Sequence, residues 1–368
     1  MLKRKKLLLS IVLVCIIILA GAGIYVCASK DIAVPEKRQT LELTQIQNNI
    51  YLSEENFVET MQNEVEPMLE SCLTDGYFKN GDISLYYRMY QMEGAEKSVV
   101  ISHGFTEYAD KYNEVIYYYL KSGYDVYIME HRGHGNSTRE VEDKGLVYIS
   151  SFDEYAKDFK MFMDEVVVKN NGSKPMYLFA HSMGGAIATR FIENNQGYFK
   201  AAVLSAPMLD VNTGSTPEGI ANLLANVMDL IGKEKSYLLG YGPYVEEYNF
   251  DGSSTSSKAR YDYYYSKESA NENYQGSGGS YAWLKAAVAE TKNLLKQENM
   301  DKIQIPVLLF QAENDSLVEA NGLYKLANGS DYVEFIMVEG AKHQLWSTPN
   351  ELLIPYFDKV FDFYSQNN

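Results

Sequence analysis

Cysteine and histidine are both scarce in this 368-residue chain, which limits the chemistry available to it. Two of the three cysteines, Cys15 and Cys27, lie in an apolar N-terminal run, so no disulfide framework is expected. The five histidines lack the spacing to cysteine or carboxylate that suggests zinc. We see no nucleotide-binding glycine loop, internal repeat or low-complexity tract. We therefore expect no metal and no cofactor.

Basic residues are also few relative to acidic ones. The chain has 33 Lys and Arg against 49 Asp and Glu, a formal net charge of −16. Such an acidic body is repelled by nucleic acid and by anionic lipid surfaces, so no nucleic-acid partner is expected. The hydrophobic content of 46% is enough for a full core. Alternating strand and helix patterns predict an α/β fold with a mostly parallel sheet flanked by helices.

The N-terminus predicts export. A basic cluster at Lys3–Lys6 precedes the uncharged apolar run Leu7–Cys27, which is long enough as a helix to cross the ~30 Å hydrocarbon layer. Because positive charge stays inside, we expect a single-pass anchor in the cytoplasmic membrane with the remaining chain extracytoplasmic. The alternative is a secreted protein released by cleavage of a signal peptide, since Ala20–Ala22 fits the small-residue cleavage rule.

The segment Tyr177–Ile192, YLFAHSMGGAIATRFI, is an apolar run, a turn and a run with helical spacing. This order predicts a strand, a sharp turn and a helix beginning near Gly184, with Ser182 at the tip of the turn. Such a nucleophile elbow exposes a serine hydroxyl above a sheet and points a helix N-terminus at developing negative charge. A serine among small residues is also common in plain turns and helix caps, so its partners decide its role.

A nucleophilic serine needs a general base, and the base needs a group that orients it. The segment Ile305–Val318 is an apolar strand ending in an acidic turn that carries Asp315, and a loop after the following strand carries His343. Ser182, Asp315 and His343 stand in a known chain order for a catalytic triad. Glu313 is the alternative acid, and Asp315 taken alone also fits a simple turn.

The same chemistry needs hydrogen-bond donors for the oxyanion. The segment Ser98–Tyr108, SVVISHGFTEY, is an apolar strand that opens into His103, Gly104 and Phe105. We predict that the backbone N–H groups of Phe105 and Met183 form the oxyanion hole. Gly104 lets the backbone turn close to the substrate, and His103 supports the loop.

Five segments carry a further likeness. They are HGFTEYADKYNEV (103–115), EHRGHGNSTR (130–139), FAHSMGGAIATRFIE (179–193), FQAEND (310–315) and EGAKHQL (339–345). In combination they resemble the monoacylglycerol lipase and bacterial lysophospholipase branch of the α/β-hydrolases, a serine aminopeptidase-like family. The resemblance runs from about Gly76 almost to the C-terminus.

Two positions depart from the family pattern. Ala180 stands where most α/β-hydrolases have glycine, but members on the lysophospholipase side also resemble A-H-S-M-G-G. Glu130 stands where the family usually has aspartate before H-R-G-x-G. We interpret Arg132, His131 and His134 of that segment as residues that brace a loop.

The resemblance implies a serine hydrolase that cleaves the fatty-acyl ester of a single-tail glycerolipid through an acyl-serine intermediate. The substrate would be a lysophospholipid or a monoacylglycerol, and the N-terminal segment would also hold the protein at a membrane. Another activity of the same fold, such as a serine aminopeptidase, and a non-catalytic surface binding protein are the alternatives. Acyl-chain length, head group and oligomeric state do not follow from the sequence.

The domain organisation follows from these assignments. We expect an anchor or signal peptide at 1–28, a polar stalk with one helix at 29–75, a hydrolase core at 76–207 and 304–368, and a lid insertion at 208–303. Strands are predicted at 83–90, 99–103, 125–129, 176–179, 201–205, 307–311 and 334–338. Helices are predicted at 111–121, 152–168, 184–194 and 351–364.

The first lid helix has the clearest boundaries. We expect Thr216 to cap it, Pro217 to occupy its first helical position and Gly232 to end it. Its apolar residues recur at helical spacing from Ile220 to Ile231. This stripe predicts either a helix packed on the core or one wall of an acyl channel.

Overall fold

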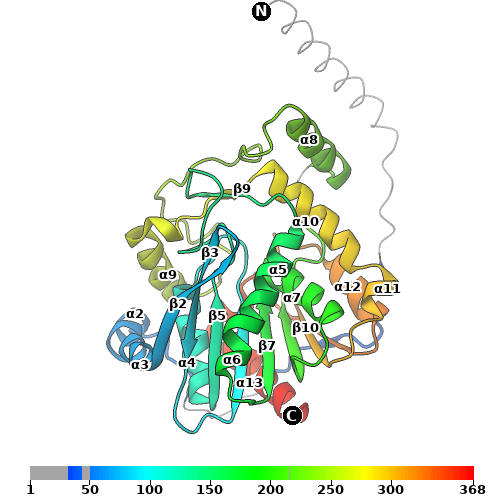
Figure 1. Ribbon diagram of the computed structural model, residues 1–368. Coiled ribbons are helices and arrows are strands. Elements are labelled where there is room, and N and C mark those ends of the chain that lie inside the picture. The colour runs from blue at the N-terminus through cyan, green and yellow to red at the C-terminus, as the bar shows by residue number, and fades with distance from the viewer. Residues whose placement is uncertain (1–31, 44–49, 215) are drawn as a thin grey trace, which may run out of the picture. The chain divides into compact units, whose positions relative to one another are not determined.

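The computed structural model describes residues 32–43, 50–214 and 216–368, and residues 34–368 form one compact unit (Figure 1). Its centre is a nine-stranded sheet in the order β1-β11-β10-β8-β7-β4-β5-β3-β2. The strands are β1 (Gln39–Thr40), β2 (Leu73–Asn80), β3 (Ile83–Tyr90), β4 (Lys97–Ser102), β5 (Tyr124–Met129), β7 (Met176–His181), β8 (Ala201–Ser205), β10 (Val307–Ala312) and β11 (Val333–Val338). Only the β2–β3 and β3–β5 pairings are antiparallel, so the predicted mostly parallel sheet is confirmed.

Helices cover both faces of this sheet, because the central strands are apolar on both sides. In β4, Val100 packs into one core cluster and Ile101 into the other, as expected for side chains that alternate along a strand. The first cluster includes α5 (Phe152–Phe162) and α7 (Met183–Asn194), which lie in front of the sheet in Figure 1. The second includes α4 (Asn113–Lys121) and α13 (Asn350–Gln366).

The predicted strands and helices of the core all form, with boundaries shifted by at most three residues. Strands β1 and β2 and helix α12 (Ala320–Gly329) were not predicted. Strand β2 contains Gly76 and several polar residues, and Phe78 is its one buried residue, so its apolar signal is weak. Helix α5 continues through a π-helical turn, η3 (Met163–Val167), into α6 (Val168–Asn170).

The segment expected to be a polar stalk belongs to the compact unit from Val34 onward. Strand β1 pairs with β11 at the edge of the sheet. The predicted helix runs through α2 (Phe57–Thr60), the π-helical turn η1 (Met61–Val65) and α3 (Glu66–Cys72). It buries one apolar side chain about every four residues, at Phe57, Met61, Val65 and Leu69. This face packs into the second core cluster, so the segment is part of the folded body.

The expectation of a single-pass membrane protein needs correction. Among residues 32–43, 50–214 and 216–368, no helix is both long enough and apolar enough to cross a bilayer. The predicted anchor, Leu7–Cys27, lies outside the described residues. The localisation inferred from the sequence therefore has no structural support.

Residues 208–303, which we call the cap, are inserted between β8 and β10. The cap contains α8 (Glu218–Leu230), α9 (Lys258–Ala270), the 3₁₀ turn η4 (Glu272–Tyr274), β9 (Gly278–Gly279), α10 (Tyr281–Leu294) and α11 (Gln297–Met300). Strand β9 pairs with β6 (Leu146–Val147) of the core. Figure 1 shows α8 at the top of the molecule, far from the sheet.

The details predicted for α8 are partly wrong. Pro217 is itself the N-cap residue, and no side chain caps the helix. Gly232 does follow the end of the helix, with φ at +70°. The buried residues are Ala221 and Ala225, whereas Leu223 and Leu224 are exposed. The apolar stripe therefore does not pack on the core as a whole.

Candidate active site

Ser182 lies where β7 ends and α7 begins, with φ at 52° and ψ at −121°. A non-glycine residue with positive φ is strained, so surrounding contacts must hold it there. The Ser182 carbonyl accepts hydrogen bonds from the N–H groups of Gly185 and Met208, both at 2.8 Å. The sequence-predicted elbow is thus present as backbone geometry.

Glycine is required directly after the elbow because other backbone segments approach it. A Cβ atom at Gly184 would lie 2.1 Å from the carbonyl oxygen of Ser102, and one at Gly185 would lie 2.4 Å from Pro207. The Ser102 oxygen belongs to the backbone and the Pro207 Cβ to a rigid ring, so neither atom can move away cheaply. Ala180, the departure from the family pattern, is fully buried in β7 opposite Ser102 of β4, where its methyl group is accommodated.

Asp315 and His343 form the pair that the sequence predicts. Nδ1 of His343 donates to Oδ2 of Asp315 at 2.6 Å, and Oδ1 accepts from the N–H groups of Leu317 and Val318. Burial would raise the pKa of Asp315, but these hydrogen bonds and His343 hold it below its ordinary value. Glu313, the alternative acid, is exposed and accepts from the N–H of Gly340 instead.

His343 has its second ring nitrogen free. Because Nδ1 donates to the carboxylate, Nε2 of the neutral ring carries a lone pair. That Nε2 is buried and has no hydrogen-bond partner among the described residues. Ser182 and His343 line the same cavity of about 400 Å³. The structure therefore brings the three predicted triad residues to one site.

The predicted oxyanion donors are unpaired. Phe105 lines the cavity, and Met183 is the first residue of α7, where the helix provides no acceptor for its N–H. Within the described chain, neither N–H makes a hydrogen bond. His103 lies against this loop: its Nδ1 donates to the Gly104 carbonyl, and its Nε2 accepts from the N–H of His131.

The loop that contains Glu130 has a bracing role, in agreement with the sequence interpretation. The Glu130 carboxylate accepts from the N–H groups of Ala109 and Asn136. Arg132 makes two hydrogen bonds to Asp158, at 2.6 and 2.9 Å. These residues face one another rather than the cavity, since none of them lines it.

The sequence reasoning missed Glu107, a buried carboxylate on the cavity wall. It accepts hydrogen bonds from the Gly104 N–H at 2.7 Å, the Tyr112 hydroxyl at 2.5 Å and the Gln344 side chain at 2.9 Å. Glu107 thereby joins the loop of Phe105 to the residue after His343.

Charge explains how Glu107 stays ionised in this environment. Burial alone would raise its pKa, but Lys111, His181 and the Tyr112 hydroxyl lower it to about 2. Lys111 lies four positions further along the chain, with Nζ 3.5 Å from Glu107. The spacing of four residues between Glu107 and Lys111 was the only local signal of this ion pair in the sequence.

The rest of the cavity is aromatic and polar. Five tyrosines line it, namely Tyr241, Tyr244, Tyr261, Tyr264 and Tyr265. The charged side chains there are Glu107, Glu247, Glu268 and Lys111. No residue of α8 lines the cavity, so its apolar stripe does not form an acyl channel in this conformation.

Comparison with known proteins finds relatives over most of the chain. The chain is 28% identical to the probable lysophospholipase L2 of Haemophilus influenzae over 284 residues, covering 77% of this chain and 88% of that protein. It is 26% identical to lysophospholipase L2 of Escherichia coli K12, covering 78% and 86%. The human monoglyceride lipase is 27% identical, with coverage of 77% and 87%.

The fold has solved counterparts. A soluble variant of the Saccharomyces cerevisiae monoglyceride lipase superposes with a TM-score of 0.65 at 17% identity, over 80% of this chain and 95% of that one. This likeness shows the α/β-hydrolase fold. The family model described as serine aminopeptidase, S33, matches residues 93–350. The chain is therefore a hydrolase of the α/β-hydrolase fold and belongs to the serine aminopeptidase S33 family.

Proposed function

We propose that this protein is a serine hydrolase that cleaves the fatty-acyl ester of a single-tail glycerolipid, a lysophospholipid or a monoacylglycerol. The observation that carries the proposal is the cavity shared by Ser182, at a strained turn, and His343, whose free Nε2 is oriented by Asp315. The names of the curated relatives support an ester substrate.

In the proposed mechanism, Nε2 of His343 takes the proton as Ser182 Oγ attacks the ester carbonyl. The oxyanion that forms accepts hydrogen bonds from the N–H groups of Phe105 and Met183, and each such donor is worth about 3–4 kcal/mol in the transition state. His343 then gives its proton to the leaving alcohol, and an acyl-serine remains. Water activated by His343 hydrolyses it. Asp315 stays ionised and keeps the imidazole in the productive tautomer.

Labelling with a fluorophosphonate probe tests this chemistry directly. Wild-type protein should be labelled, whereas Ser182→Ala and His343→Ala should lose the label. Ser254→Ala is a matched control because Ser254 lines the same cavity but does not lie at the elbow. A wild-type protein that stays unlabelled while correctly folded would contradict the proposal and would favour a non-catalytic binding protein.

The charge of the cavity favours a second candidate substrate, an acyl compound that carries an ammonium group. Three carboxylates against one lysine leave an excess of two negative charges. Glu268 has no ion-pair partner in the described part of the chain. Tyrosine faces also attract cations, and Nζ of Lys111 already lies 5.8 Å from the centre of the Tyr264 ring.

Two sources could supply such a group: a choline or ethanolamine head group, or the free amine of an aminopeptidase substrate. Turnover of lysophosphatidylcholine, lysophosphatidylglycerol, monoolein and an aminoacyl amide should be compared with wild type and Glu268→Gln. Selective loss of lysophosphatidylcholine turnover in Glu268→Gln would support the head group. Greatest wild-type turnover on the amide would replace the lipid proposal with an aminopeptidase.

A further inference from the structure

Arg260 is a fully buried arginine in the first turn of the cap helix α9. Its Nε and Nη2 donate to the carboxylate of Glu114, in core helix α4, at 2.8 and 2.7 Å. A buried guanidinium requires such a partner, because an unpaired charge is strongly disfavoured away from water. Glu114 makes the closest ion pair with Arg260, and the remaining partners add contacts to it.

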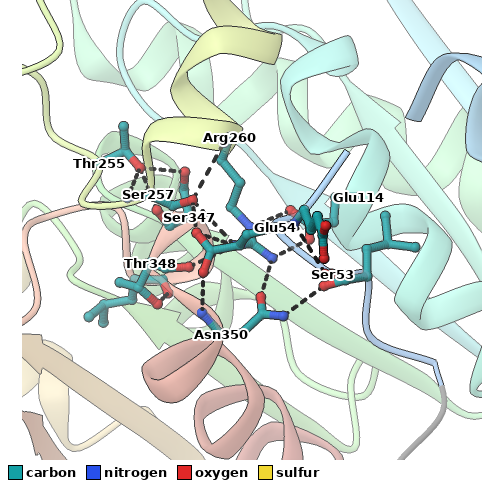
Figure 2. A network of polar contacts seen from close by, with 12 residues as sticks. Ser53, Glu54, Glu114, Thr255, Ser257, Arg260, Ser347, Thr348 and Asn350 are labelled. Atoms are coloured by element: carbon teal, nitrogen blue, oxygen red, sulfur yellow. Dashed lines mark hydrogen bonds and ion pairs between the residues drawn. The ribbon is translucent and has the colours of Figure 1, made fainter. Parts of the chain in front are cut away.

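Those other partners come from two segments far apart in the sequence (Figure 2). Nη1 donates to the Thr348 carbonyl at 3.1 Å and Nη2 to Oδ1 of Asn350 at 2.8 Å, both just after the loop of His343. Glu54 approaches Nη1 at 3.5 Å from the N-terminal side. Arg260 thus contacts the cap, the core and the segment just after the loop that carries His343.

Glu54 joins the same segments independently of Arg260. One carboxylate oxygen accepts from the Ser257 hydroxyl of the cap, and the other accepts from the Asn350 N–H at 3.1 Å. The Asn350 side chain donates to the Leu52 carbonyl at 2.8 Å. Figure 2 shows Glu54 between the cap side chains and Asn350.

The helix that follows Glu54 extends the contact along α9. The Arg260 guanidinium lies 5.0 Å from the centre of the Phe57 ring. Glu66 accepts from the Tyr263 hydroxyl at 2.8 Å and pairs with Lys267 at 2.7 Å. In Figure 1, α2 and α3 lie below α9 on the same side of the molecule.

We propose that residues 50–72, which we call the clasp, position the catalytic site, with Glu54 as the main positioning residue. The clasp holds the start of α9, where Tyr261, Tyr264 and Tyr265 line the cavity, against the loop that presents His343. It lies outside residues 93–350, the part that the family model covers.

Glu54→Gln is the sharpest test, because it keeps the size of the side chain and leaves the Arg260–Glu114 pair intact. The new amide would place a donor where one oxygen now accepts. Glu55→Gln is the matched control, since Glu55 is adjacent, exposed and makes no side-chain contact to the cap. Because the proposal rests on the proposed serine chemistry, the first readout is the rate of fluorophosphonate labelling.

We expect Glu54→Gln to slow labelling roughly 10-fold, less than the ~100-fold that a misplacement of about 1 Å can cost, while its unfolding midpoint stays near that of wild type. Glu54→Asp should recover part of the rate, and Glu55→Gln should match wild type. A wild-type labelling rate in Glu54→Gln, or a loss explained by unfolded protein alone, would overturn the clasp proposal.

A second measurement separates failure of the clasp from failure of the proposed function. If wild type is not labelled, amide hydrogen exchange still tests whether the clasp holds α9 against the loop of His343. Exchange over residues 255–265 and 344–350 should increase in Glu54→Gln and remain unchanged in Glu55→Gln. Unchanged exchange in both variants would overturn the proposal.

Discussion

Helices α8 and α9 belong to the same cap but differ in what holds them. Helix α9 contains a buried arginine, three tyrosines on the cavity wall and contacts to the clasp. Helix α8 buries only two alanines and leaves Leu223, Leu224 and Leu230 exposed. The difference indicates that α9 is a firmly held wall of the cavity, whereas α8 is held by fewer buried side chains and lies outside the cavity wall.

The largest effect should come from Arg260→Met. The change leaves Glu114 buried with its charge unpaired, which typically costs about 3–5 kcal/mol of unfolding free energy. Urea denaturation measures the loss. Lys258→Met, on the exposed face of the same helix, is the control and should leave the midpoint unchanged. Equal midpoints for wild type and Arg260→Met would mean that α9 is no more firmly held than α8.

The second largest effect is expected from acid, which should lower the free energy of unfolding. Burial lowers the pKa of His103 and His181 to about 4. Unfolded histidines titrate near 6.5, so the unfolded chain binds more protons between pH 6.5 and 4. Stability is therefore lost as pH falls through this window, by ~1.4 kcal/mol per pH unit for each histidine.

Other buried groups modify this slope. His131 and His134 also have pKa values lowered by burial and act in the same direction. Glu193 and Asp210, whose pKa values burial raises to about 8 and about 6, act in the opposite direction and offset two of the four histidines. Urea midpoints at pH 7, 6 and 5 would measure the net slope. A flat profile would contradict the neutral, buried state of these rings.

A smaller effect is expected for Ala225→Leu. Ala225 is a buried residue of α8, a helix that packs on α10, and overpacking of a buried site costs roughly 1–3 kcal/mol. Thermal unfolding would show the loss. The labelling rate at Ser182 should stay at the wild-type value, because α8 does not line the cavity. A slower rate would show that α8 and the site are coupled.

The smallest effect is expected for Leu230→Ser. The Leu230 side chain is 86% exposed, so the stability change should stay within about 0.5 kcal/mol. Turnover of a dispersed, soluble ester should also stay unchanged. If turnover falls, the exposed face of α8 takes part in substrate delivery. In that case α8, like α9, affects the site.

The sequence by itself determined the elements that depend on neighbouring residues. The strands with continuous apolar runs, the elbow at Ser182 and the turns that carry Asp315 and His343 are all local patterns. The α/β class follows from the alternation of these elements. The polar strand β2 and the short edge strand β1 could not be predicted, because pairing across the sheet stabilises them.

Tertiary structure decided everything that joins residues far apart in the chain. Arg260 meets Glu114 across 146 positions, and Gln344 meets Glu107 across 237. No local pattern encodes such pairs, since each side chain alone is consistent with a solvated surface. Folding decided which groups are buried and which stay in water. It buried Glu107 of the cavity wall and Arg260, which contacts the clasp, and it left one apolar face of α8 exposed.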